Sequence, residues 1–163
     1  MSELEPLLER VRLAVFDFDG VFTDNRVWVN DRGEESLGFW RGDGLGLRRL
    51  DDVGVEYLVV STEPNPVVRV RSAKLGIDCM QGIDDKLSAV RERSEAFGFS
   101  LEEVAYVGND INDAECLRAV GLPVVPADAW PEVVPLARWV LTCGGGAGCV
   151  REFCDTVWAA QRP

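Results

Sequence analysis

The feature that most constrains the fold of this chain is a series of short apolar runs, each ending at a polar residue or a glycine. The runs cover residues 13–16, 57–60, 104–107, 122–125 and 139–141. Strands that are apolar at successive positions are typical of a sheet covered on both faces. Helical patterns separate the runs, so the sequence predicts an α/β fold with a doubly wound, Rossmann-like and mostly parallel sheet.

The helices are predicted from their ends. A helix over 66–75 has Asn65 as its N-cap, a proline in its first turn and a glycine after its last residue. Two further helices are predicted over 86–98, after an aspartate cap, and over 45–53. The glycine-rich segment 144–148 is interpreted as a flexible link into a last helix.

One segment interrupts this alternation. Residues 26–29 and 35–39 flank a turn-rich tetrad, which predicts a β-hairpin flap over about 24–40, directly after the first strand. No second block is long enough for a separate cap domain. We therefore expect a single domain over 1–163 with a C-terminal tail over about 143–163.

Composition removes several classes of function. The chain has 17 Lys plus Arg against 28 Asp plus Glu, a net charge of −11, which argues against binding nucleic acid or an anionic membrane. It has no histidine, which excludes Ser-His-Asp catalysis and His-ligated zinc. The five cysteines form no C-x-x-C pair, and no apolar stretch reaches the length of a membrane helix. Together these observations predict a soluble, cytoplasmic protein with reduced thiols.

Polar residues follow the predicted strands. Asp17 and Asp19 come directly after the first run, Ser61 follows the second, and an acidic cluster that includes Asp110 follows the third. Sites in open α/β sheets form at the carboxyl ends of strands. Two neighbouring carboxylates need an offsetting charge, and oxygen ligands without histidine suit Mg²⁺. Lys86 lies at a helix start, where a cation is disfavoured unless an anion is nearby.

These residues together carry a resemblance. The motif D-F-D-G-V-F-T-D from residue 17, Ser61, Lys86 and G-N-D-I-N-D from residue 108 resemble the haloacid dehalogenase superfamily over nearly the whole chain. The segment G-G-A-G-C-V-R-E over 145–152 is similar to the tail of its capless sugar-acid branch. That branch holds the 3-deoxy-octulosonate 8-phosphate phosphatases and their sialic-acid relatives.

The resemblance implies roles for four catalytic residues. Asp17 is expected to be the nucleophile that accepts the phosphoryl group, and Asp19 to act as general acid and base. Ser61 and Lys86 would hold and neutralise the phosphoryl oxygens. Because Asp19 must carry a proton near neutral pH, we predict that burial and neighbouring carboxylates raise its pKa.

The metal ligands depart from the family pattern at one position. The side chain of Asp17 and the backbone carbonyl of Asp19 are two expected Mg²⁺ ligands. The third is usually an aspartate after the glycine of the last motif, but here that residue is Asn109. An amide oxygen can still bind Mg²⁺ with less charge. The alternatives are that Asp110 takes over this role, or that Asp113 acts through a water molecule.

The expected substrate-binding residues are Thr62, Glu63, Arg71, Lys74 and Gly44. The pattern of Glu63, Arg71 and Lys74 resembles enzymes acting on 2-keto-3-deoxynononate or N-acylneuraminate 9-phosphate, and also the phosphatase-like domain of some sialate cytidylyltransferases. Arg71 and Lys74 would pair with a substrate carboxylate, while Glu63 would accept hydrogen bonds from sugar hydroxyls. The alternative is that the two cations belong to the solvated face of a helix.

The resemblance also implies a homotetramer in which neighbouring subunits border each active site. Trp28, Phe39 and Trp40 fit such an interface, or else cover the core of their own subunit. The leading hypothesis is a Mg²⁺-dependent phosphatase acting on a small phosphorylated sugar acid with nine carbons. The alternatives are an eight-carbon 3-deoxy-octulosonate 8-phosphate phosphatase and a catalytically silent oligomerisation domain associated with a sialate cytidylyltransferase. A phosphorelay receiver domain fits less well, because its phosphoacceptor lies on a later strand.

Overall fold

The computed structural model describes residues 3–162 and contains one parallel sheet of six strands. In chain order the strands are β1 (Leu13–Phe16), β4 (Glu56–Val60), β5 (Asp78–Met80), β6 (Val104–Val107), β7 (Leu122–Val125) and β8 (Trp139–Val140). Their spatial order is β5-β4-β1-β6-β7-β8, and all neighbours pair in parallel. The predicted doubly wound sheet is confirmed.

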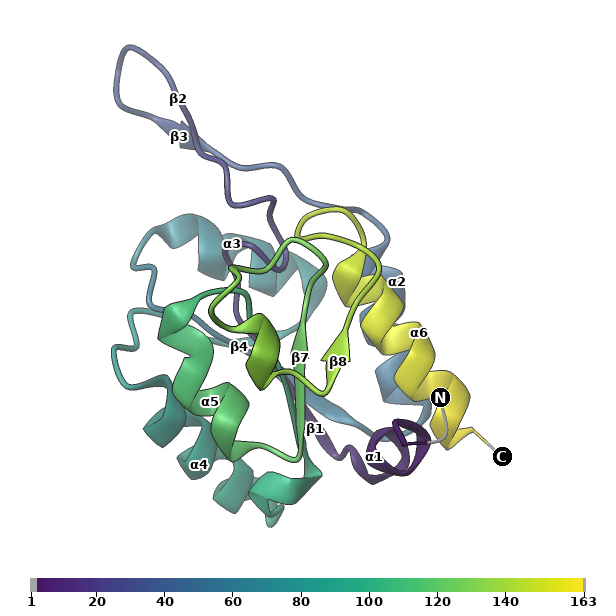
Figure 1. Ribbon diagram of the computed structural model, residues 1–163. Coiled ribbons are helices and arrows are strands. Elements are labelled where there is room, and N and C mark those ends of the chain that lie inside the picture. The colour runs from purple at the N-terminus through teal and green to yellow at the C-terminus, as the bar shows by residue number, and fades with distance from the viewer. Residues whose placement is uncertain (1–2, 163) are drawn as a thin grey trace.

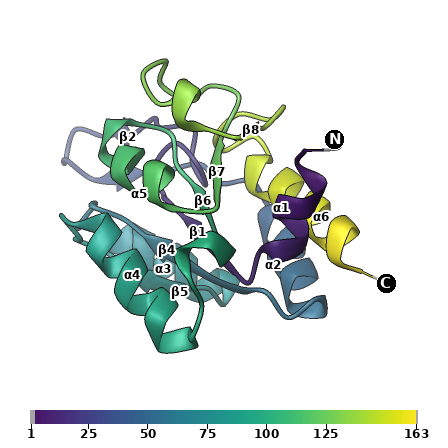
Figure 2. The same ribbon diagram turned by 60° about the horizontal axis from the view of Figure 1, so that its bottom comes forward.

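Helices cover both faces of this sheet (Figures 1 and 2). They are α1 (Glu5–Arg10), α2 (Asp43–Asp52), α3 (Pro66–Leu75), α4 (Lys86–Phe97), α5 (Ala114–Ala119) and α6 (Cys149–Gln161). Three short 3₁₀ turns complete the set, η1 (Leu101–Glu103), η2 (Ile111–Asp113) and η3 (Val134–Leu136). No helix within residues 3–162 combines the length and the apolar character that a membrane span requires.

The central strand β1 shows why its run is wholly apolar. Ala14 and Phe16 face the core beneath α1, α2, α3 and α6, whereas Leu13 and Val15 face the core beneath α4 and α5. All four side chains are fully buried. Because successive residues of a strand point to opposite faces, only a strand covered on both sides needs apolar residues at every position.

The helix ends follow local chemistry. The side chain of Asn65 accepts a hydrogen bond from Val67 N at 3.0 Å, and Gly76 ends α3 in the left-handed conformation at φ 72°. The bounds of α3 agree with the prediction. Helix α2 begins at Asp43, two residues before the predicted start. The edge strand β5 was not predicted, because its three residues carry little apolar signal.

The predicted flap is present as a two-stranded antiparallel hairpin, β2 (Trp28–Val29) and β3 (Glu35–Ser36). Its strands are shorter than the predicted runs, and it projects away from the sheet (Figure 1). Between β1 and α2 the described chain holds this hairpin and no separate cap domain.

The glycine-rich segment 144–148 is packed closely, which corrects its interpretation as a flexible link. Gly146 N donates to Val21 O at 3.0 Å. A Cβ on Gly145 would lie 2.1 Å from the carbonyl oxygen of Gly20. Glycine is therefore required because the two backbones are in direct contact. The segment supports the loop that follows β1.

Candidate active site

The predicted polar residues meet at the carboxyl edge of the sheet. A pocket of about 100 Å³ lies beyond the ends of β1, β4 and β6. It is lined by Asp17, Asp19, Asn25, Ser61, Thr62, Asn109, Asp110 and Asn112. This placement follows from parallel pairing, because the strands all end at the same edge. Residues far apart in the sequence are thereby brought into one small polar cavity.

A buried ion-pair network lies beneath this pocket. Lys86, from the first turn of α4, donates from Nζ to Asp17 Oδ1 and to Asp113 Oδ1, both at 2.8 Å. The three side chains are almost completely buried. Lys86 therefore joins the residue after β1 to the loop after β6. The N-cap Asp85, which accepts from Ser88 N at 2.9 Å, fixes the helix end that presents Lys86.

Tyr106 is a member of this network that the sequence analysis missed. Its hydroxyl donates to Asp113 Oδ1 at 2.6 Å from within β6, and the residue is fully buried. The other oxygen of Asp113 accepts from Asn109 N at 2.9 Å and from Asp110 N at 3.3 Å. Asp113 thus fixes both Lys86 and the backbone of the last motif. The only sequence signal for Tyr106 is a hydroxyl within an otherwise apolar strand.

The charges of the network shift its pKa values. Burial raises the pKa of Asp17 to about 7, the Asp113 carboxylate adds to this rise, and the Lys86 ammonium opposes it. Burial acts to lower the pKa of Lys86, but the two carboxylates raise it above its usual value. The pKa values of Asp17 and Lys86 are both raised because one ammonium between two carboxylates leaves an excess negative charge, which favours bound protons.

Asp19 lies in a more open part of the pocket than Asp17. Burial raises the pKa of Asp19, the nearby Glu63 carboxylate adds to this rise, and a hydrogen bond with Thr23 opposes it. The prediction of a raised pKa is confirmed. The turn that follows depends on Gly20, which has φ +82° and donates from its N to Thr23 Oγ1 at 3.1 Å.

The oxygens around Asn109 fit a small cation. One atom of its side-chain amide lies 2.8 Å from the carbonyl oxygen of Asp19 and 3.2 Å from Asp17 Oδ2. With the amide nitrogen turned to this point, Asn109 donates to both oxygens. With the amide oxygen there, its distances to these two oxygens match the spacing of adjacent ligands around Mg²⁺, whose Mg–O distances are about 2.0–2.1 Å. A bound cation would offset their repulsion and hold the amide in this orientation.

The two alternative ligands are placed less favourably. Asp110 lines the pocket, but its side chain accepts from Ile111 N at 2.7 Å and caps η2. Asp113 is fully buried and committed to Lys86 and Tyr106. Within residues 3–162 no group of three or more Cys, Asp or Glu residues is placed to hold a metal ion. The ligand set that fits therefore mixes a carboxylate, a backbone carbonyl and an amide.

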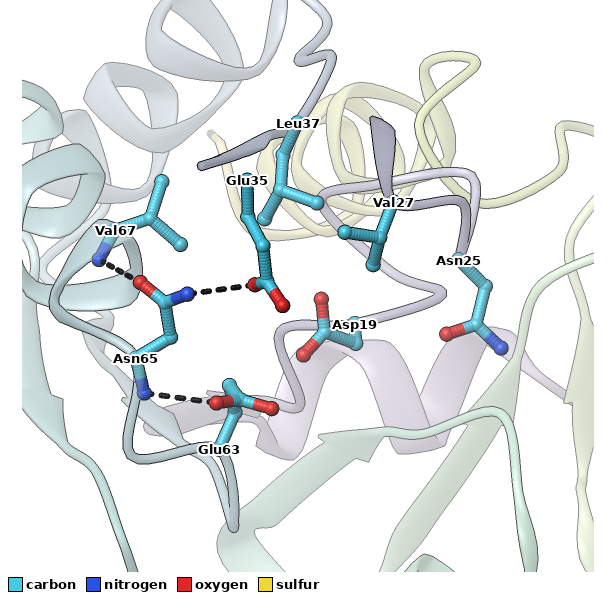
Figure 3. A pocket seen from close by; sticks show the side chains of 8 residues that line it. All are labelled: Asp19, Asn25, Val27, Glu35, Leu37, Glu63, Asn65 and Val67. Atoms are coloured by element: carbon cyan, nitrogen blue, oxygen red, sulfur yellow. Dashed lines mark hydrogen bonds between the residues drawn. The ribbon is translucent and has the colours of Figure 1, made fainter. Parts of the chain in front are cut away.

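A second pocket, of about 180 Å³, adjoins the first on the flap side (Figure 3). It is lined by Asp19, Asn25, Val27, Glu35, Leu37, Glu63, Asn65 and Val67. Asp19 and Asn25 line both pockets, so the two pockets are neighbours. Of the predicted substrate-binding residues, Glu63 lies here and Thr62 lies in the first pocket.

The remaining substrate-binding candidates are elsewhere in the subunit. Arg71, Lys74 and Gly44 line a third pocket, of about 410 Å³, together with Phe39, Arg41, Arg48 and Leu75. The guanidinium of Arg71 lies 4.9 Å from the centre of the Phe39 ring. These residues therefore meet one another as a basic pocket, but in the described chain they do not line either pocket that contains Asp19.

The flap aromatics divide into two kinds. Phe39 packs against Phe18 with ring centres 5.7 Å apart and so covers the core of the chain to which it belongs. Trp28 and Trp40 are 69% and 48% exposed. Phe39 therefore covers the core, whereas the expectation of a subunit interface at Trp28 and Trp40 stays a prediction.

Comparison with known proteins places the chain in a family. A family model described as haloacid dehalogenase-like hydrolase matches residues 60–148. The 3-deoxy-D-manno-octulosonate 8-phosphate phosphatase of Escherichia coli K12 is 38% identical over 154 residues, which are 94% of this chain and 82% of the relative.

Two solved structures are also similar. The 3-deoxy-D-manno-octulosonate 8-phosphate phosphatase of Yersinia pestis has a TM-score of 0.93 at 34% identity, with 98% of this chain and 86% of that chain covered. The corresponding enzyme of Moraxella catarrhalis, in complex with magnesium, phosphate and a KDO molecule, has a TM-score of 0.94 at 30% identity and coverages of 99% and 93%. The chain belongs to the haloacid dehalogenase-like hydrolase family, and the relatives named here are phosphatases.

Proposed function

We propose that this protein is a Mg²⁺-dependent phosphatase that hydrolyses the phosphomonoester of a sugar acid through a phosphoryl group carried on Asp17. The observation that carries this proposal is the buried contact between Asp17 and Lys86, with Asp19 lining the same pocket. A carboxylate that is fixed beside a cation, next to a second carboxyl of raised pKa, provides a nucleophile and an acid in one cavity.

The proposed reaction has two displacements. A carboxylate oxygen of Asp17 attacks phosphorus while the bond to the sugar oxygen breaks, and Asp19 gives its proton to that oxygen. Water then attacks the phosphoryl group, Asp19 takes a proton from the water, and the bond to Asp17 breaks to release phosphate. Lys86 and Ser61 hold the charged phosphoryl oxygens.

Mg²⁺ would be held by a carboxylate oxygen of Asp17, the carbonyl oxygen of Asp19 and the amide oxygen of Asn109. When bound, the ion neutralises phosphoryl charge and helps to align the ester for in-line attack. The position of the Asn109 side-chain amide, 2.8 Å from the carbonyl oxygen of Asp19 and 3.2 Å from Asp17 Oδ2, supports this ligand set, because the amide can turn its oxygen to a cation bound there. The Moraxella relative, whose structure contains magnesium and phosphate, supports the choice of metal.

For the substrate, we propose 3-deoxy-octulosonate 8-phosphate. This eight-carbon acid is the substrate in the names of the relatives that cover most of the chain. The eight-carbon acid replaces the nine-carbon acid as the leading hypothesis, since none of the named relatives carries a nine-carbon substrate in its name. A nine-carbon keto-acid 9-phosphate remains the second candidate because of the pattern of Glu63, Arg71 and Lys74.

The basic pocket suggests how the substrate carboxylate is recognised. Arg71 and Lys74 do not line the pockets around Asp19 in their own subunit. We propose that these cations reach the active site of a neighbouring subunit in a homotetramer, where they pair with the substrate carboxylate. The exposed Trp28 and Trp40 would contribute to the subunit interface.

The test is phosphate release from the eight-carbon and nine-carbon keto-acid phosphates, with Mg²⁺ and with chelator. We expect Mg²⁺-dependent release that is faster from the eight-carbon ester. Faster release from the nine-carbon ester would retain the mechanism and reverse the substrate assignment. No release above that of Asp17→Asn from either ester would favour the silent oligomerisation domain.

A further inference from the structure

The pocket on the flap side of the site is positioned to hold the alcohol part of the substrate. It shares Asp19, the proposed proton donor to the leaving oxygen, with the pocket that contains Asp17. A phosphoryl group beside Asp17 would therefore direct its ester oxygen and the attached carbon chain towards this second pocket. Figure 3 shows Glu35 and Glu63 pointing into it from opposite sides, with Asp19 beside them.

The lining of this pocket favours hydrogen-bond donors. The eight lining residues include three carboxylates and two amides but no lysine or arginine. The Glu35 and Glu63 carboxylates lie close enough to Asp19 to contribute to its raised pKa. A substrate carboxylate would be repelled here, whereas hydroxyl groups would form charge-assisted hydrogen bonds. The polyol end of the substrate fits this pocket, and its acid end fits the basic pocket.

A single residue holds both glutamates. Asn65 N donates to Glu63 Oε1 at 2.8 Å, and Asn65 Nδ2 donates to Glu35 Oε2 at 2.7 Å. Its Oδ1 accepts from Val67 N at 3.0 Å and so caps α3. Glu35 lies on β3 of the flap, so Asn65 connects the flap to the body of the subunit (Figure 3).

We propose that Glu35 is a specificity-determining residue that, together with Glu63, accepts hydrogen bonds from hydroxyl groups of the leaving alcohol. Asn65 is the positioning residue that holds Glu35 over the pocket. This inference rests on the proposed phosphatase function and deepens it. It predicts that the enzyme selects esters with hydroxyl groups close to the phosphate, apart from any recognition of the acid end.

The first test compares two esters. One is 3-deoxy-octulosonate 8-phosphate, and the other is p-nitrophenyl phosphate, which has no hydroxyl group on its leaving part. In Glu35→Gln, the ratio of kcat/KM for the first ester to kcat/KM for the second should fall on the order of tenfold, because a charged acceptor is replaced by an amide. The matched control is Glu34→Gln, next to Glu35 on the flap but outside the pocket lining. It should leave the ratio within about twofold.

A second test separates positioning from binding. Asn65→Asp keeps a side-chain oxygen that can cap α3 but places a negative charge against Glu35. It should lower the same ratio and speed cleavage by trypsin after Arg32, which is exposed on the flap. In the double variant Asn65→Asp with Glu35→Gln, the new glutamine can donate to the aspartate. Protection from trypsin should therefore return while the ratio stays low.

The outcomes distinguish this inference from the function on which it rests. If the wild type shows no Mg²⁺-dependent hydrolysis of either ester, the proposed function fails and the inference with it. If the wild type hydrolyses both esters but Glu35→Gln changes them equally, the function stands and the role of Glu35 is wrong. If Asn65→Asp lowers the ratio without faster cleavage at Arg32, its role in holding the flap is wrong.

Discussion

The catalytic centre and the flap are built in opposite ways, although they line neighbouring pockets that share Asp19. Around Asp17 the charged groups are buried, and Asp113 alone accepts hydrogen bonds from Lys86, Tyr106 and the backbone of the last motif. The flap has short strands and exposed residues, and a hydrogen bond from the half-buried Asn65 to the exposed Glu35 connects it to α3. The proposed function therefore assigns the chemistry to a preorganised core, and the further inference assigns selectivity to an exposed surface element.

The largest effect should come from the nucleophile. Asp17→Asn removes the attacking carboxylate, so we expect phosphate release to fall by about 10³-fold or more. Asp24→Asn, on the same loop but exposed, is the control and should retain activity. Substantial turnover by Asp17→Asn would show that the buried carboxylate is not the nucleophile. The chemistry could then no longer be assigned to the buried core.

The next effect should be on stability. Asp113→Ala leaves the Tyr106 hydroxyl without its acceptor and removes one of the two carboxylates beside Lys86. Breaking a buried charge network of this kind costs about 3–5 kcal/mol in the free energy of unfolding. Urea denaturation would measure it. A cost below about 1 kcal/mol would mean that the catalytic centre is no more rigid than the flap.

A smaller effect should appear in the pH dependence of stability without metal. The folded state raises the pKa of Asp17 to about 7 and so binds more protons than the unfolded state between about pH 4 and 7. The free energy of unfolding should therefore fall as pH rises through this range, by at most about 1.4 kcal/mol per pH unit for one group. Mg²⁺ favours the ionised carboxylate, so its stabilising effect should grow with pH.

Asp43 provides a matched comparison for this pH experiment. Burial raises its pKa to about 7 as well, and its Oδ1 has no hydrogen-bond partner. Thermal unfolding at several pH values would compare Asp17→Asn with Asp43→Asn, each of which should remove part of the slope. Only Asp17→Asn should also remove the pH dependence of stabilisation by Mg²⁺. Equal responses of the two variants to the metal would contradict a metal site at Asp17.

The smallest effect should come from the basic pocket. Lys74 is exposed, and an exposed ion pair contributes about 0.2–1 kcal/mol, so Lys74→Ala should raise KM for a sugar-acid phosphate about two- to fivefold. The free energy of unfolding should change by less than about 0.5 kcal/mol. Steady-state kinetics on the sugar-acid ester and on p-nitrophenyl phosphate would check this. A KM that rises equally for both esters would argue against recognition of a carboxylate by Lys74.

Much of the fold could be predicted because its signals are local. The buried run of β1, and the cap and glycine of α3, each depend on a few neighbouring residues. Strand β5 was missed because parallel pairing with β4, rather than its own residues, makes it a strand. The close packing of the segment 144–148 was missed for the same reason, since its contacts are with the loop after β1.

In the candidate site too, residues with a local sequence signal were predicted and residues that depend on distant partners were not. The sequence indicated Asp17, Asp19 and Lys86, because charged residues after apolar strands or at helix starts stand out. It did not indicate Tyr106, which looks like a core residue, or Glu35, which looks like a solvated residue of a hairpin. Their roles depend on partners that are distant in the sequence, so only the three-dimensional structure brings them to notice.

The most direct test of the central claim is a rapid-quench experiment with a ³²P-labelled sugar-acid ester and Mg²⁺. If the buried carboxylate of Asp17 carries the phosphoryl group, acid-quenched protein should contain ³²P in the first turnover, and Asp17→Asn should contain none. Turnover of the ester by the wild type without label on the protein, or equal labelling of Asp17→Asn, would contradict the account.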